Sequence, residues 1–95
     1  MPLNYPNPDL QNLIDALSTL TTKEEIANFL RDLLTVKELE DISQRWQIVL
    51  LLSQKLPYLE IAKQVGVSTT TVTRVALWLN HGKGGYQTAL SRLKK

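Results

Sequence analysis

Hydrophobic residues recur along this chain at the three- and four-residue spacing of amphipathic helices, and no segment alternates as a strand would. Residues 1–8 hold three of the four prolines, which predicts an extended arm rather than a helix. Asp9 is a suitable N-cap for a first helix, because its carboxylate can accept from free backbone N–H groups. The apolar face of this helix consists of Leu10, Leu13, Ile14, Leu17 and Leu20.

Two capping boxes predict where the next helices begin. Thr22 with Glu25, and Thr35 with Glu38, have the spacing at which each side chain can cap the other's backbone N–H. The second helix then aligns Ile26, Phe29, Leu30, Leu33 and Leu34. The third and longer helix directs inward Leu39, Ile42, Trp46, Val49, Leu50 and Leu52.

Residues 58–79 read as two short helices joined by a tight turn at Gly66, which adopts left-handed backbone angles easily. Pro57 suits the first turn of the fourth helix, and Ser68 suits the N-cap of the fifth. Small or apolar residues fall where two such helices would cross, namely Ile61, Ala62, Val65, Val67, Val72, Val75 and Leu79. The pattern is typical of a helix-turn-helix, whose second helix enters a DNA major groove.

The predicted fold is all-α, with about six short helices in a single domain over residues 9–95. Residues 9–56 supply the dimerisation helices, and residues 57–80 supply the helix-turn-helix. Glycines at 82, 84 and 85 interrupt the chain, which leaves residues 86–95 for a C-terminal helix.

Composition removes several classes of function. With 95 residues, of which 43% are hydrophobic, the chain can build one modest core. It has no cysteine and one histidine, His81, so we expect no metal site and no cofactor. No apolar run approaches the ~20 residues of a membrane span, and no secretion signal is visible, so a cytoplasmic protein is expected. No catalytic triad or apolar carboxylate pair is present, which predicts a protein that is not an enzyme.

The charge is divided along the chain. Residues 1–57 carry five basic and eight acidic side chains, whereas residues 58–95 carry six basic side chains and only Glu60 as an acid. Such an asymmetry suits a second half that meets phosphates. The alternative is a frayed basic tail, since Arg92, Lys94 and Lys95 supply half of that positive charge.

The first two helices have apolar faces wider than a monomer of this size needs, with both Leu33 and Leu34 in the second. Helices of this kind commonly pack against a twofold partner, so we expect a homodimer built by the acidic N-terminal half. A dimer would also place two reading helices on a palindromic DNA site. An ordinary monomer core is the alternative.

Hydroxyl side chains dominate the outer face of the fifth helix. Thr69, Thr70 and Thr73 are predicted to contact base edges, where a threonine methyl can meet a thymine methyl. The predicted phosphate contacts are Lys63, Thr71, Arg74 and Lys83. Arg74 has two alternative roles, in a ligand pocket with Arg45 or in a surface ion pair, and the threonines could be a plain solvated face.

The chain resembles the Trp repressor superfamily from about residue 33 to residue 79. The resemblance rests on residues 33–35 at a helix start, residues 44–49 within that helix, Gly66 at the turn and residues 71–74 in the reading helix. Residues 78–86 look like the YerC-like branch in particular. The resemblance implies an intertwined dimer with a DNA-reading head, and a pocket at Thr35, Arg45 and Arg74 that holds tryptophan in Trp repressor.

Two residues depart from the tryptophan-binding pattern. Val75 stands where the pocket needs a glycine, and Trp78 stands where it needs a serine. We therefore expect a vestigial or remodelled pocket, with Trp78 filling it, and no role for L-tryptophan as corepressor. Both Trp46 and Trp78 fall on apolar helical faces, which predicts that they are core residues.

The predicted function is sequence-specific binding of double-stranded DNA by a dimeric transcriptional regulator, acting as a repressor on a short palindrome. One alternative is a protein-interaction scaffold that works through the N-terminal apolar helices. The other is a small-ligand sensor with a remodelled Arg45 and Arg74 pocket. The operator, the regulated genes and any effector are not encoded in a readable pattern.

Overall fold

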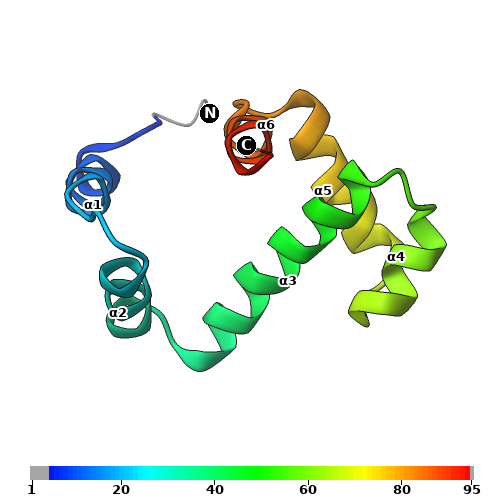
Figure 1. The fold of residues 1–95 in the computed structure, drawn as a ribbon, viewed down its shortest axis with the longest axis horizontal. Helices are drawn as coiled ribbons and strands as arrows, with labels where there is room; N and C mark the ends of the chain where they lie inside the picture. The colour runs from blue at the N-terminus through cyan, green and yellow to red at the C-terminus, as the bar shows by residue number, and fades with distance from the viewer. Residues whose placement is uncertain (1–4, 95) are drawn as a thin grey trace. The chain divides into compact units, whose positions relative to one another are not determined.

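The computed structural model describes residues 5–94, and in this range it contains six α-helices and no strand. They are α1 (Pro8–Ser18), α2 (Lys23–Leu33), α3 (Val36–Ser53), α4 (Tyr58–Val65), α5 (Thr69–His81) and α6 (Gly85–Leu93) (Figure 1). The predicted all-α fold is confirmed. The first half of the predicted arm, residues 1–4, and Lys95 lie outside the described residues.

The chain divides into two compact units. The N-terminal unit extends to Leu39 and contains α1, α2 and the first turn of α3. The C-terminal unit begins at Glu40 and contains the rest of α3 together with α4, α5 and α6.

Helix α1 begins earlier than the sequence indicated. Its N-cap is Asn7, whose Oδ1 accepts a 2.8 Å hydrogen bond from the backbone N–H of Leu10. The prediction of Asp9 as N-cap is wrong, because Pro8 occupies the first helical position, where its fixed φ and missing N–H are tolerated. Asp9 instead lies in the first turn, where its charge favours the helix dipole.

Thr22 and Thr35 cap their helices as predicted, and the reciprocal box forms at Thr35, whereas Glu25 bonds one residue earlier than predicted, at Thr21. Thr22 Oγ1 accepts from Glu25 N at 3.1 Å, while Glu25 Oε1 accepts from Thr21 N at 2.9 Å. At the start of α3 the exchange is reciprocal, with Thr35 N donating to Glu38 Oε1 at 2.9 Å and Glu38 N donating to Thr35 Oγ1 at 3.1 Å. The Thr21 backbone N–H, chiefly, holds the pKa of Glu25 below its usual value.

The apolar faces of α1 and α2 remain accessible. Neither helix contains a buried residue, and Ile14, Ile26 and Leu33 are between 42% and 46% exposed. The N-terminal unit therefore consists of well-capped helices without a core of their own.

The C-terminal unit contains every buried residue of the described chain. Helix α3 contributes three residues, α4 two and α5 three, namely Ile48, Val49, Leu51, Ile61, Ala62, Val72, Val75 and Ala76. This confirms the apolar pattern predicted for the helix-turn-helix. On α3 the prediction of Val49 was right, and Trp46 and Leu52 pack half-buried against the core as predicted. Ile42 is exposed, and Ile48 and Leu51 are buried although they were not predicted to face inward. The reason is that the core forms around the C-terminal half of α3. The buried face of α3 is therefore the face that meets the other core residues, and not the face that the whole helix would present by periodicity.

The turns of this unit follow from backbone geometry. Gly66 ends α4 with φ +84°, and its N–H donates to the Ala62 carbonyl at 2.9 Å. Ser68 caps α5 as predicted, accepting from Thr71 N at 3.2 Å. The end of α3 was not anticipated, because Lys55, a non-glycine residue, adopts φ +68° there.

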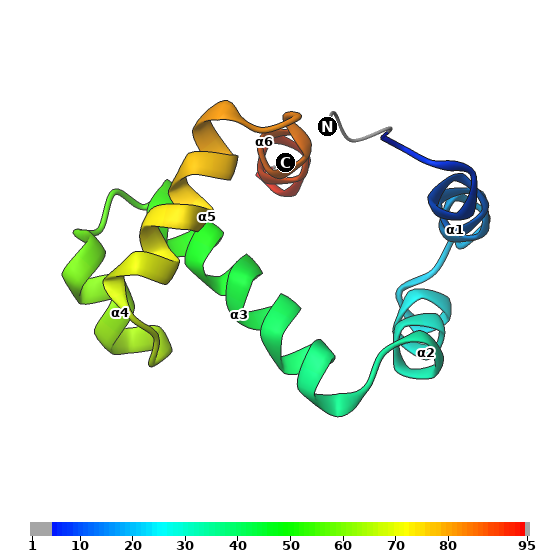
Figure 2. The same ribbon diagram turned by 180° about the vertical axis from the view of Figure 1, so that it is seen from behind.

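Helix α6 packs against the rest of the C-terminal unit, with Tyr86 and Leu90 half-buried against its core. The Tyr86 ring lies 6.1 Å from the Trp46 ring on α3, between centroids, and Gln87 Nε2 donates to the Leu79 carbonyl at 2.8 Å. Gly84 precedes the helix with φ +84°, so α6 begins at Gly85, one residue earlier than predicted. Figure 2 shows α5 running across the C-terminal half of α3, with α4 at its side.

Candidate nucleic-acid interface

Helix α5 has the two-sided character of a reading helix. Its inner side is buried through Val72, Val75 and Ala76. Thr69, Thr70 and Thr73, the predicted base contacts, are all exposed at its N-terminal end. The Thr73 hydroxyl donates to the Thr69 carbonyl at 2.9 Å, and its oxygen can still accept a further hydrogen bond.

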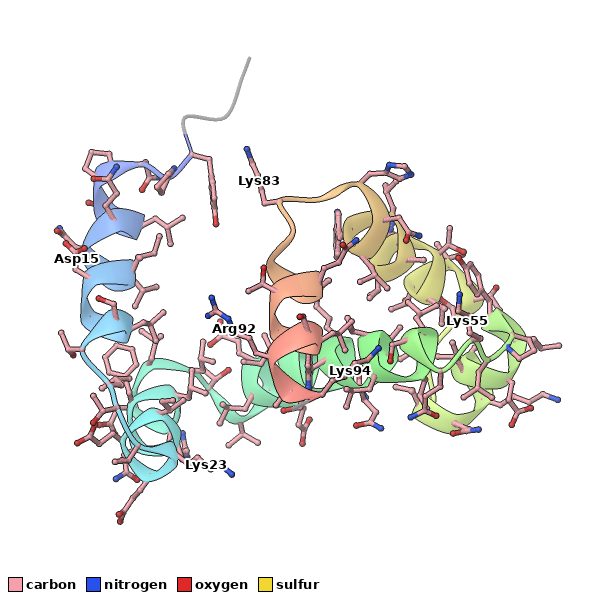
Figure 3. All side chains as sticks on the ribbon, turned by 45° about the horizontal axis from the view of Figure 1, so that its top comes forward. Asp15, Lys23, Lys55, Lys83, Arg92 and Lys94 are labelled. Atoms are coloured by element: carbon pink, nitrogen blue, oxygen red, sulfur yellow. The ribbon has the colours of Figure 1, made fainter. Side chains whose placement is uncertain are left out.

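The predicted phosphate contacts fall into two groups. Lys63 and Arg74 are exposed near the turn, and half-buried Thr71 shares a 3.1 Å hydrogen bond with the Ser68 hydroxyl. Lys83 follows the other end of α5, and this helix ends at His81, about 18 Å along its axis from Thr69 at the α-helical rise. Figure 3 shows Lys83 in the link between α5 and α6, with its amine directed away from the helices. The structure therefore does not bring Lys83 to the turn with the others.

Three further exposed residues of α4 and α5 were not singled out from the sequence. Leu77 is 55% exposed on α5, four residues after Thr73 and three after Arg74, which is the spacing of one helix face. Tyr58 and Leu59 are exposed at the start of α4. The Tyr58 hydroxyl is a hydrogen-bond donor suited to a phosphate oxygen. Helical spacing from Thr70 and Thr73 would have found Leu77.

A cavity of about 270 Å³ lies between α3 and α5 within the C-terminal unit. Its lining combines buried Ile48 and Val75 with polar groups on both helices, including Arg45 and Arg74. Asp41, Gln44, Val67, Thr71 and Trp78 complete it. An apolar floor with guanidinium groups at the rim could hold a small anionic ligand.

The predicted pocket residues Arg45, Arg74, Val75 and Trp78 all line this cavity, and Thr35 is not among its lining residues. Thr35 instead caps α3. The expectation that Trp78 is a core residue is wrong, since 45% of its side chain is exposed. The guanidinium carbon of Arg45 lies 5.9 Å from the centroid of the Trp78 ring. Trp78 thus lines the cavity and leaves space in it.

Residues 5–94 contain no grouping of histidine and carboxylate side chains that could hold a metal ion. Within the same range, no helix has the length and apolar character needed to cross a bilayer.

Comparisons with known proteins agree on one family. The sequence model described as Trp repressor protein matches residues 8–94. The uncharacterised protein YerC of Bacillus subtilis (strain 168) is 33% identical over 87 residues, which cover 92% of this chain and 84% of YerC.

Two solved structures share the fold along nearly the whole chain. A TrpR-like protein from Eubacterium eligens ATCC 27750 superposes with a TM-score of 0.85 at 32% identity, covering 94% of this chain and 92% of that one. A candidate Trp repressor from Staphylococcus aureus superposes with a TM-score of 0.83 at 36% identity, covering 93% and 88%. The family match over residues 8–94 and the similarity to YerC together show that this chain belongs to the Trp repressor superfamily, in its YerC-like branch.

Proposed function

We propose that this protein is a DNA-binding transcriptional regulator that reads sequence through the outer face of α5. The observation that carries the proposal is the two-sided character of α5, whose inner side is buried while Thr69, Thr70 and Thr73 are exposed beyond the Ser68 cap. This is the arrangement in which the N-terminal residues of a recognition helix meet base edges. Membership of the Trp repressor superfamily supports the same function.

The exposed side chains make two kinds of contact with DNA, to base edges and to phosphates. Threonine hydroxyls and methyls at positions 69, 70 and 73 contact base edges in the major groove, with thymine methyls as natural apolar partners. Lys63, Arg74 and the Thr71 hydroxyl contact phosphates around the turn and set the register of the head. Lys83 contacts a phosphate farther along the duplex. These contacts neutralise phosphates, so affinity falls steeply with salt.

The protein acts as a homodimer on a palindromic site and represses by occupying a promoter. The dimer is supported by the exposed apolar side chains of α1 and α2, which a second copy of the chain would cover. A twofold dimer presents two α5 helices to half-sites about one helical turn apart.

Selection of bound sequences from random DNA at near-physiological salt tests the proposal. The expected result is a short palindrome with thymines in each half-site. Lys63→Ala and Arg74→Ala should each weaken binding and reduce the slope of log affinity against log salt by about one unit. Lys23→Ala, on α2 in the N-terminal unit (Figure 3), is the matched control and should leave both quantities unchanged. Failure to enrich any sequence, or a slope unaffected by both head variants, would overturn the proposed interface.

The cavity favours a second candidate function, a small-ligand sensor. About 270 Å³ of space between α3 and α5, lined by Arg45 and Arg74, could admit an effector that alters the α5 position. We propose that L-tryptophan is not this effector. Val75 stands where the tryptophan pocket needs a glycine, which narrows the space for the ligand, and Trp78 stands where it needs a serine, which removes the serine hydroxyl. Calorimetric titration checks this, and micromolar binding of L-tryptophan would contradict it.

A protein-interaction scaffold is the remaining alternative, supported by the same exposed apolar side chains of α1 and α2. Salt separates it from DNA binding, because an apolar protein contact should weaken little as salt rises.

A further inference from the structure

Trp78 occupies an unusual place for a large aromatic side chain. It lies in the last third of α5, and 45% of it is exposed, whereas Val75, one turn earlier on the same helix, is 1% exposed. The guanidinium carbon of Arg45, a residue of α3, lies 5.9 Å from the centroid of the Trp78 ring. One side-chain pair therefore bridges α3 and α5 outside their buried contact.

The bridge lies at the rim of the cavity between these two helices. On this flank the surface between α3 and α5 has a hollow of about 270 Å³, which the buried Ile48 and Val75 also line. Dense packing of buried side chains normally fixes the angle between helices. A guanidinium over an indole face adds a directional attraction at the solvent-exposed side of that packing.

The backbone next to Trp78 is also constrained. The Trp78 carbonyl accepts a 2.9 Å hydrogen bond from the N–H of Gly82, and a Cβ at position 82 would collide with the same carbonyl oxygen. Gln87 from α6 holds the neighbouring Leu79 carbonyl. Two hydrogen bonds thus hold the end of α5 close to the residue that reaches Arg45.

We propose that Arg45 and Trp78 are positioning residues that fix the angle of α5 over α3, so that the reading face is held for DNA by the chain itself. Neither side chain needs to touch DNA in this role. The effect on DNA binding rests on the proposed function, but the contact between Arg45 and Trp78 can be tested without DNA.

The first experiment measures coupling by a double-mutant cycle on the full chain. Arg45→Gln, Trp78→Leu and the double variant are unfolded with denaturant, and the single variants should be non-additive by about two- to fivefold in the unfolding equilibrium constant. Trp78→Phe, which keeps an aromatic face, should retain part of the coupling. Additive effects would overturn the bridge.

A spectroscopic arm isolates the same pair. In a Trp46→Phe background Trp78 is the sole tryptophan, since the chain has two. Arg45→Gln should then shift the emission of Trp78 and raise its quenching by acrylamide, a neutral quencher, because the guanidinium no longer covers the ring. Glu40→Gln, on the same helix outside the cavity, is the control and should leave the spectrum unchanged. Identical spectra for Arg45→Gln and its parent would contradict the contact.

The DNA arm distinguishes positioning from direct contact. Trp78→Leu should weaken affinity for a selected site about two- to fivefold while the salt slope stays unchanged, because no phosphate contact is lost. Trp78→Phe should recover part of the loss. A slope that falls with Arg45→Gln as it does with Lys63→Ala would make Arg45 a phosphate contact and overturn the positioning role. Absence of DNA binding by the unaltered protein would refute the proposed function. The double-mutant cycle and the Trp78 emission would still show whether Arg45 and Trp78 interact.

Discussion

The two compact units of this chain differ in how they treat their apolar side chains. In the C-terminal unit, eight hydrophobic residues from α3, α4 and α5 are buried against one another. In the described part of the N-terminal unit none is buried, although α1 and α2 are equally well formed and capped. A helix can therefore be specified by its caps and periodicity without having a place to bury its face.

The difference separates two requirements of the proposed regulator. The C-terminal unit holds the reading helix by its own core, which suits a head that must present side chains in fixed positions. The N-terminal unit offers apolar faces that gain stability by meeting another surface. Four perturbations would break or sharpen this division.

The largest effect on stability is expected in the core of the C-terminal unit. Ile61→Ala should lower the free energy of unfolding by about 2–5 kcal/mol, because Ile61 is fully buried and its truncation leaves a cavity. Leu59→Ala, on the same helix but 61% exposed, is the control and should change it by about 0.5 kcal/mol or less. Denaturant unfolding followed by circular dichroism measures both. Equal losses of unfolding free energy in the two variants would mean that the C-terminal unit has no independent core around Ile61.

The next effect tests the N-terminal faces. Ile26→Asp should weaken a dimer by roughly tenfold or more, since burying an isoleucine contributes about 1.5–3 kcal/mol and a charge cannot be buried there. Asn28→Asp, exposed on the other side of α2, introduces the same charge and should leave assembly intact. Sedimentation equilibrium gives the dissociation constants. An unaltered protein that is monomeric at all concentrations would refute the dimer.

A smaller effect is expected at the turn of the helix-turn-helix. Gly66→Ala should destabilise the protein by about 1 kcal/mol, because φ is +84° although open space surrounds the position. Gly85→Ala, at the start of α6, should instead be neutral or slightly stabilising, since its backbone needs no positive φ. Thermal unfolding compares the two. The same sign at both positions would argue against the left-handed turn.

The smallest effect concerns the cap of α2. The pKa of Glu25 is lowered from 4.5, mainly by the Thr21 backbone N–H, so the carboxylate stabilises the helix start above that pH. This contribution is lost as pH falls through the lowered pKa of the folded protein. The Thr21 amide resonance, followed by NMR, should titrate with a midpoint below 4.5 and stop titrating in Glu25→Gln. Glu24→Gln should leave that titration in place.

Local features of the fold were largely predictable. Thr22, Thr35 and Ser68 cap helices as their spacing indicated, and Gly66 forms the expected left-handed turn. Asp9 was misassigned because the choice between neighbouring caps depends on where Pro8 falls in the first turn. The exposure of Thr69, Thr70 and Thr73 also followed from periodicity.

The place of Trp78 was not predictable in the same way. It lies on an apolar stripe, which indicated burial, yet the structure exposes nearly half of it beside Arg45. Residues 45 and 78 are far apart in the chain, so their contact depends on how α5 crosses α3.

The amino-acid sequence by itself determined where α2, α3 and α5 begin and where α4 ends, because those caps and turns are hydrogen bonds between residues three to five positions apart. Only the tertiary structure decided that Ile48 and Leu51 face the core and that a cavity opens between Arg45 and Arg74. Those outcomes depend on which faces of separate helices meet, and periodicity within one helix does not contain that information.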